Sequence, residues 1–150
     1  MPTALRKLTT IGWREWLALP DFGLGCVQGK IDTSHQTAKI YALDVECLLV
    51  DGSPWMRFVV LPLPGDPRTR VEAQAPLVAE RAVRGLDGRR DLRPVVRTLL
   101  TLGDVTWPVE LALCGQETVG YRLLIGREAI DRRFVVDSAR SFLAGPPAVN

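Results

Sequence analysis

A carboxylate followed by two hydroxyl side chains, Asp32-Thr33-Ser34, is the stretch of this sequence best suited to chemistry. It follows an alternating apolar run at 27–31 and precedes a second strand-like run that starts at residue 38. A carboxylate on a tight turn after an apolar strand can activate water when a second carboxylate shares its proton. The sequence has one convincing triplet of this kind, so this interpretation requires the second carboxylate to come from another chain. Ordinary turn chemistry is the alternative, because Asp, Thr and Ser all favour turns.

Apolar residues alternate with a period of two almost everywhere, which predicts an all-β barrel or sandwich. Turn signals at Asp51-Gly52 and Gly103-Asp104 predict two hairpins. One short helix is expected near the C-terminus, at 126–133. Strands are expected at 13–19, 27–31, 38–50, 55–61, 71–83 (interrupted at Pro76), 95–102, 105–113, 121–125 and 134–136.

The composition is that of one globular domain spanning residues 1–150. Hydrophobic residues make up 47% of the 150 residues and charged residues 24%, and the net charge of +2 is too small to indicate nucleic-acid binding. The three cysteines are widely spaced, which argues against a disulfide framework and favours a reducing cytoplasm. No apolar run approaches the ~20 residues that span a bilayer, and no signal peptide is visible, so a protein without membrane contact is expected.

The residues that could hold a cofactor are few. The chain has one histidine, His35, and no His-Glu-x-x-His motif, so a catalytic zinc site is not expected. A Gly-x-x-x-x-Gly-Lys-Ser/Thr loop for ATP is missing from the sequence. We therefore expect neither a metal nor a nucleotide cofactor.

Five short motifs, in order, resemble the retropepsin-like aspartic peptidase fold, a closed β-barrel with one short C-terminal helix. The resemblance covers about 11–143 and is closest to a bacterial family that has been labelled ATP-dependent zinc proteases, although these residues support neither zinc nor ATP. The motifs are Gly12-Trp13-Arg14-Glu15-Trp16, Lys30-Ile31-Asp32-Thr33 with Thr37 and Ala38, Arg93-Pro94-Val95-Val96-Arg97-Thr98, Leu123-Leu124-Ile125-Gly126-Arg127-Glu128-Ala129, and Arg133-Phe134-Val135-Val136-Asp137 with Ser141-Phe142-Leu143.

The resemblance implies a homodimeric aspartic endopeptidase with one Asp32 from each subunit. The ionised aspartate would take a proton from water while the protonated one polarises the peptide carbonyl. Thr33 would brace the turn through its hydroxyl, and the backbone N–H of Ser34 would donate to the carboxylates. Gly126 would lie where another backbone passes too close for a Cβ. Asp137-Ser138-Ala139 imitates a second half-site, but it comes too late in the chain for one and is expected to be a turn.

Two residues depart from the family's Asp-Thr-Gly-Ala pattern, namely Ser34 and His35. Ser34 keeps the backbone N–H, but its side chain must fit beside the two-fold axis, and glycine permits backbone angles that serine resists. A catalytically weakened binding or regulatory module is therefore the alternative to an active enzyme. His35 is either a solvent-facing turn residue or a pH-dependent group beside the cleft.

Members of the resembled family are often encoded beside ATP-grasp ligases that add glutamates to proteins, which implies a glutamate-rich peptide or protein tail as substrate and a functional link to such a ligase. Lys30 and Arg97 are candidates for carboxylate contacts, with His35 and Gly126 also assigned to the substrate site. Arg127 is a further candidate, with a salt bridge to the adjacent helix as the alternative. The six arginines between 81 and 97 form either a surface for an acidic partner or a solvated loop.

Two further expectations concern the surface. A flap that closes over substrate is expected from residues 43–60, with its tip at Asp51-Gly52. The four tryptophans, Trp13, Trp16, Trp55 and Trp107, are expected in the core. A contiguous exposed tryptophan patch away from Asp32 would instead indicate a structural interaction domain.

Overall fold

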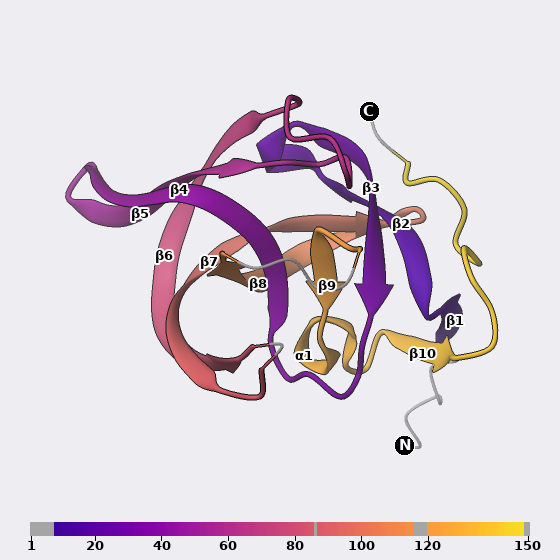
Figure 1. The fold of residues 1–150 in the computed structure, drawn as a ribbon. Coiled ribbons are helices and arrows are strands. Elements are labelled where there is room, and N and C mark those ends of the chain that lie inside the picture. Colours follow the sequence, from indigo (N-terminus) through magenta and orange to yellow (C-terminus); the bar gives the residue numbers. More distant parts are fainter. Residues whose placement is uncertain (1–7, 86, 116–119, 149–150) are drawn as a thin grey trace, which may run out of the picture.

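The computed structural model describes residues 8–85, 87–115 and 120–148. It is built almost entirely of strands, drawn in Figure 1, which confirms the all-β class. The elements in chain order are β1 (Thr9–Gly12), β2 (Arg14–Leu19), the 3-10 turn η1 (Pro20–Phe22), β3 (Leu24–Ile31), β4 (Ala38–Val50), β5 (Ser53–Val60), β6 (Val71–Arg84), β7 (Arg90–Leu102), β8 (Val105–Cys114), β9 (Leu123–Ile125), α1 (Arg127–Ile130) and β10 (Phe134–Asp137).

Eight of the strands form one sheet in the order β2-β3-β9-β4-β5-β6-β7-β8. Additional pairings of β2 with β7 and of β4 with β8 close a ring through β2, β3, β9, β4, β8 and β7. The remaining strands, β5 and β6, continue outward from β4 and return to β7. The closed sheet implied by the resemblance is therefore present, with the short helix α1 lying below β9 in Figure 1.

The interior of the ring is filled by the apolar residues of alternating strand positions. The predicted face of β8 is correct, since Trp107, Val109, Leu111 and Leu113 are all at most 4% exposed. Trp107 also donates from Nε1 to the Ala129 carbonyl at 2.9 Å, which anchors α1 to the sheet. Burial of such side chains is the main source of the fold's stability.

Three of the four tryptophans lie outside the core, contrary to expectation. In the first part of β2, Glu15 and Leu17 are buried and the period of two turns Trp16 outward, where it stacks on Phe142 at 5.3 Å. Trp13 and Trp55 are likewise half-buried. Strand periodicity predicts which residues of β2 point inward and which point outward. It does not predict which outward side chains, such as Trp16, are covered by the segment that contains Phe142.

The strand break expected at Pro76 is wrong, because β6 runs continuously from Val71 to Arg84. Pro76 is the last residue paired with β5, opposite Trp55, and pairing with β7 starts at Leu77. Proline lacks the N–H that a ladder needs, and it is tolerated here where the strand changes partners. Strand β1, which the sequence analysis did not predict, pairs in parallel with β10.

Glu15 joins the two ends of the fold. Its side chain is fully buried and accepts hydrogen bonds from Gly12 N (2.7 Å), Leu143 N (2.9 Å) and Ala144 N (3.1 Å). Three backbone donors satisfy a charge that would otherwise be costly to bury. None of the helical segments in the described part of the chain has the length and apolar character needed to cross a membrane.

Candidate active site

Asp32 lies directly after β3, at the start of a tight turn. Its backbone N–H donates to the Ile125 carbonyl at 2.9 Å, and its carbonyl accepts from His35 N at 3.2 Å. Its carboxylate is held within the turn, because Ser34 donates to Oδ1 from its backbone N at 3.0 Å and from its hydroxyl at 2.5 Å. The carboxylate is thus fixed in direction while its side chain remains 20% exposed.

The amine of Lys30 and the imidazole of His35, which is positive only when protonated, approach the other carboxylate oxygen. Lys30 Nζ lies 4.0 Å and His35 Nε2 3.6 Å from Asp32 Oδ2. Partial burial raises the pKa of Asp32, but the two hydrogen bonds from Ser34 and the charges of His35 and Lys30 together lower it below the usual value of 3.8. The isolated chain therefore presents an ionised carboxylate, which is the form that a general base requires.

His35 is partly buried against this carboxylate. Burial lowers the pKa of His35 below its usual value of 6.5, and the nearby positive charge of Lys39 acts in the same direction, while Asp32 opposes both. The neutral imidazole is therefore favoured near neutral pH. Of the two interpretations of His35, the position beside the cleft agrees with its contact to Asp32 and its place in the pocket wall.

A second segment passes behind the turn. Strand β9 lies between β3 and β4, parallel to the first and antiparallel to the second. At Gly126 the backbones approach so closely that a Cβ would lie 2.8 Å from the Gln36 carbonyl oxygen and 2.9 Å from the His35 carbonyl oxygen. Arg127 N then donates to His35 O at 2.8 Å. The close passage expected at Gly126 is present, and it clamps the turn from behind.

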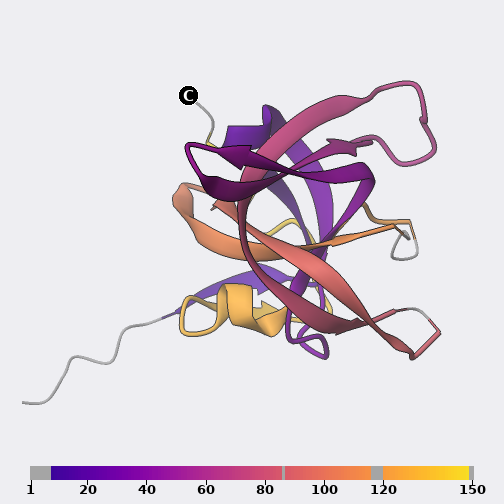
Figure 2. The same cartoon turned by 90° about the vertical axis from the view of Figure 1, so that its left-hand side faces the viewer.

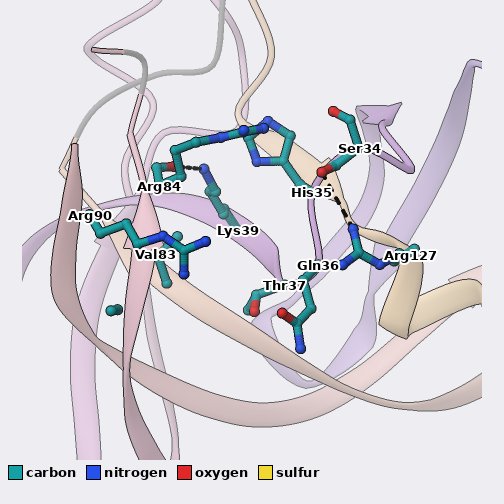
Figure 3. A pocket seen from close by; sticks show the side chains of 10 residues that line it. Ser34, His35, Gln36, Thr37, Lys39, Val83, Arg84, Arg90 and Arg127 are labelled. Carbon is teal, nitrogen blue, oxygen red and sulfur yellow. Dashed lines mark hydrogen bonds between the residues drawn. The ribbon is translucent and has the colours of Figure 1, made fainter. Parts of the chain in front are cut away.

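A pocket of about 110 Å³ opens beside the turn (Figure 3). One wall comes from the turn itself and from Lys39 at the start of β4, and the opposite wall comes from the end of the β6–β7 hairpin. Arg127 on α1 completes it and donates from Nη1 to the carbonyls of Thr33 and Ser34, each at 3.4 Å. The lining residues are Ser34, His35, Gln36, Thr37, Lys39, Ala82, Val83, Arg84, Arg90 and Arg127.

The sequence-predicted residues are only partly brought together. Lys30, Ser34, His35 and Gly126 all contact or adjoin the Asp32 turn. Thr33 is on the turn, where its carbonyl accepts from Arg127, and the bracing role of its hydroxyl stays a prediction. Arg127 contacts the turn through the carbonyls of Thr33 and Ser34, which agrees with its place as a candidate beside the site.

Arg97 is placed elsewhere. It borders a different hollow, together with Trp107, Glu110 and Arg133, and it does not line the pocket beside Asp32. The residues that occupy the expected place of Arg97 are Arg84 and Arg90, which belong to the arginine-rich stretch noted in the sequence, and Lys39, which was overlooked. Lys39 sits in an apolar strand and is only 8% exposed, so no pattern in the sequence marked it as a site residue.

The flap assignment also changes. Figures 1 and 2 show the tip of the β4–β5 hairpin far from the turn after β3. The end of the β6–β7 hairpin lies beside that turn in both views, and its residues line the pocket. A bond from Lys39 Nζ to the Arg84 carbonyl links this hairpin to the start of β4. The β6–β7 hairpin, and not the β4–β5 hairpin, is therefore the segment that lies next to the pocket.

Asp137 forms the turn expected of it, since Ala139 N donates to its Oδ1 at 3.0 Å. Within residues 8–85, 87–115 and 120–148, no three histidine, cysteine or acidic side chains gather in a way that could hold a metal ion. Cys26, Cys47 and Cys114 are free thiols.

Comparison with known proteins agrees with this geometry. The sequence matches a family model described as RimB-like, retropepsin-like aspartic endopeptidase RimB, over residues 10–147. The chain belongs to the RimB-like family. A solved structure of a Legionella pneumophila protein of unknown function has a TM-score of 0.78 and 26% identity, and the match covers 92% of this chain and 99% of that one.

Curated relatives of this RimB-like chain carry a different name. Proteins named probable alpha-L-glutamate ligase from Desulfotalea psychrophila and Parasynechococcus marenigrum are 35% and 34% identical over 86% and 90% of this chain. A similar protein from Shewanella pealeana is 30% identical. The chain spans only 28–30% of the length of these relatives.

Proposed function

We propose that this protein is a homodimeric aspartic endopeptidase in which each subunit contributes Asp32. The observation that carries the proposal is the Asp32 turn, with its fixed, ionised carboxylate held by Ser34 at the end of β3 and clamped from behind at Gly126. Membership of a retropepsin-like family supports the same chemistry. Thr33 and Ser34 are exposed, so the turn is accessible to a second copy.

The chemistry requires two carboxyl groups close together. Two adjacent aspartates cannot both ionise easily, so the second Asp32 keeps a proton and the pair titrates as a unit. The ionised member removes a proton from a water molecule, which attacks the peptide carbonyl, and the protonated member donates to the carbonyl oxygen. The proton taken from water is finally delivered to the departing amine nitrogen, so that atoms and charges balance.

Glutamate-rich chains are the substrate that we favour. The pocket beside Asp32 is lined by cations, and charge complementarity selects acidic peptides. The relatives named glutamate ligases support a link, because a ligase that joins glutamates and a hydrolase that cuts between them act on the same polymer. We therefore propose that the protein works in the cytoplasm alongside an ATP-grasp ligase.

A second candidate rests on the Ser34 hydroxyl. Its bond to Asp32 Oδ1 at 2.5 Å occupies an oxygen that an assembled pair needs for its shared proton and its water. A subunit held in this state is a binding or regulatory module. Replacement of Ser34 by glycine separates the two candidates, since it raises activity from nothing only if the parent is silent.

The decisive experiment mixes active and inactive subunits. Asp32→Asn alone should abolish cleavage of a glutamate-rich peptide, and Asp137→Asn, in the Asp137-Ser138-Ala139 turn, is the matched control that should retain it. When unfolded parent and Asp32→Asn chains are refolded together, only dimers with two aspartates cut, so activity should fall as the square of the parent fraction. A linear fall, or an active monomer in sedimentation, contradicts a shared site.

A further inference from the structure

Arg81, on β6, carries a charge that the pairing of its own strand does not explain. Its partner in the β6–β7 ladder is Arg93, so two arginines lie directly opposite each other. Like charges at such positions destabilise a pair of strands. Arg93 forms an ion pair along its own strand, with Nη2 3.5 Å from Asp91 Oδ2. The place of Arg81 must therefore be explained by groups outside β6 and β7.

Arg81 bridges two carboxylates that belong to different elements. Its Nη2 donates to Glu110 Oε1 at 2.7 Å, on β8, the strand beyond β7 in the sheet. Its Nη1 donates to Glu128 Oε2 at 3.4 Å, in the first turn of α1. A planar guanidinium can hold two carboxylates at fixed angles, which the single ammonium of lysine does less well. Arg81 therefore connects β6 to both β8 and α1.

Glu128 extends this connection to the Asp32 turn. Its second oxygen, Oε1, accepts from Gln36 Nε2 at 2.6 Å, and its backbone N donates to the Gln36 carbonyl at 3.1 Å. One residue thus holds Gln36 by its side chain and by its backbone. Gln36 lies four positions after Asp32 and lines the pocket beside it (Figure 3). A continuous series of hydrogen bonds runs from Arg81 to the turn.

This series joins the two walls of the pocket. The close passage at Gly126 and the bonds from Arg127 hold the turn from the β9–α1 segment, on its own side. The opposite wall is the end of the β6–β7 hairpin. The bond from Lys39 Nζ to the Arg84 carbonyl connects that wall to β4, and the bonds of Arg81 connect β6 to the turn itself.

We propose that Arg81 is a positioning residue for the Asp32 turn, acting through Glu128 and Gln36. The Glu128 side chain is 46% exposed, so without Arg81 its carboxylate is free to turn into solvent. Gln36 then loses the acceptor of its side chain, and the turn loses its connection to β6. The effect on catalysis rests on the proposed peptidase, whereas the effect on the placement of the turn does not.

NMR of the Arg81→Gln protein tests the placement of the turn without any substrate. The side-chain NH₂ signal of Gln36 should move toward the position of a free glutamine. The His35 amide, which donates to the Asp32 carbonyl at 3.2 Å, reports on the turn itself. Its exchange with solvent should become about three- to thirtyfold faster, because two partly exposed ion pairs are lost.

Arg70→Gln is the matched control. It removes the same charge and breaks an ion pair of similar length, with Arg70 Nη2 2.8 Å from Asp44 Oδ2, outside the pocket. It should leave the Gln36 signal in place and change the exchange of the His35 amide by less than about twofold. Equal changes in the two variants would show a general loss of stability and overturn the positioning role.

Two further variants test the route through Glu128. Arg81→Lys keeps the charge but holds one carboxylate less firmly, so its effects should lie between those of the parent and Arg81→Gln. Glu128→Gln keeps an oxygen for Gln36 but loses the attraction to Arg81. Adding it to Arg81→Gln should change the His35 exchange little further, because both changes break the same connection. Fully additive effects would overturn the proposed route.

Cleavage of a glutamate-rich peptide separates this inference from the peptidase proposal. A turn displaced by about half an ångström should lower the kcat of Arg81→Gln by about tenfold, with KM changed less, while Arg70→Gln stays within about twofold of the parent. If the parent cuts and Arg81→Gln keeps its kcat, or if the Gln36 and His35 signals do not move, the inference is overturned and the peptidase stands. If both signals move in a parent that cuts nothing, the positioning role stands and the peptidase proposal falls.

Discussion

Replacement of Gly126 by alanine tests whether the close passage behind the Asp32 turn holds the site together. Gly126 has φ −81° and ψ 170°, which alanine adopts without strain, so any cost comes from contact alone. The new Cβ would lie 2.8 Å from Gln36 O and from Thr37 C, about 0.6 Å inside the 3.4 Å at which ordinary contact begins. All three nearest atoms are backbone, so the turn or β9 must move.

The expected loss follows from these contacts. Overpacking of this size lowers the free energy of unfolding by about 1–3 kcal/mol. Alanine also reduces the conformational entropy of the unfolded chain, which raises the free energy of unfolding by about 0.4–1 kcal/mol. A net loss of about 1–2 kcal/mol lowers Tm by roughly 2–8 °C in a domain of this size. Because the displaced atoms carry the Asp32 turn, a shift approaching 1 Å should also lower kcat by about a hundredfold.

Thermal unfolding followed by circular dichroism measures the stability change, and peptide cleavage measures the rate. Gly25→Ala is the matched control, since nothing lies within 4 Å of its Cβ position and its φ is not in the left-handed region. It should melt within about 1 °C of the parent. If Gly126→Ala does the same and keeps full activity, the close passage does not position the turn.

Two further changes address individual carboxylates. Glu15→Gln replaces one acceptor oxygen by an NH₂ group that faces the backbone donors of Gly12, Leu143 and Ala144. The free energy of unfolding, measured in urea, should therefore fall by about 2–3 kcal/mol. The control Glu80→Gln, at an exposed position, should change it by less than about 0.5 kcal/mol. Ser34→Ala removes a hydrogen bond that lowers the pKa of Asp32, so the carboxyl carbon resonance of Asp32 should titrate at higher pH. Because the folded pKa lies below the usual 3.8, ionised Asp32 stabilises the fold above that pH, and this contribution is lost as pH falls through the folded pKa. The variant should therefore be less stable than the parent near neutral pH and equal to it once both are protonated; a constant difference at every pH would contradict this cause.

Local signals in the sequence were sufficient for most strands. Asp51-Gly52 and Gly103-Asp104 marked real hairpin turns, because positive φ at Asp51, Gly52 and Gly103 is what tight turns require of such residues. Strand β4 has the bounds expected from its apolar pattern. These features depend on neighbouring residues and are therefore visible in one sequence.

What the sequence did not reveal depends on contacts between distant segments. Strand β1 has only four residues and exists through its pairing with β10, more than 120 positions later. A proline within a strand pattern predicts a break, and the change of partner strand that accommodates Pro76 cannot be read locally.

The candidate site shows the same division. Asp32, Ser34 and His35 are neighbours in sequence and could be named, whereas Lys39, Arg84 and Arg90 meet only when the β6–β7 hairpin folds back. The curvature of the sheet, which decides which hairpin reaches the turn, is a property of the whole ring. The unexpected place of Arg97 has the same cause, because Arg97 lies on β7, the second strand of that hairpin, but farther from the turn.

The parallel pairing of β1 with β10 has a mechanical consequence. Tension applied before Thr9 and after Asp137 pulls the two strands in opposite directions along their own axes. All of their cross-strand bonds then bear the load together, in shear, whereas an antiparallel pair pulled from adjacent ends opens one bond at a time. A fold fastened in this way should withstand stretching from its ends better than its four-residue terminal strands suggest.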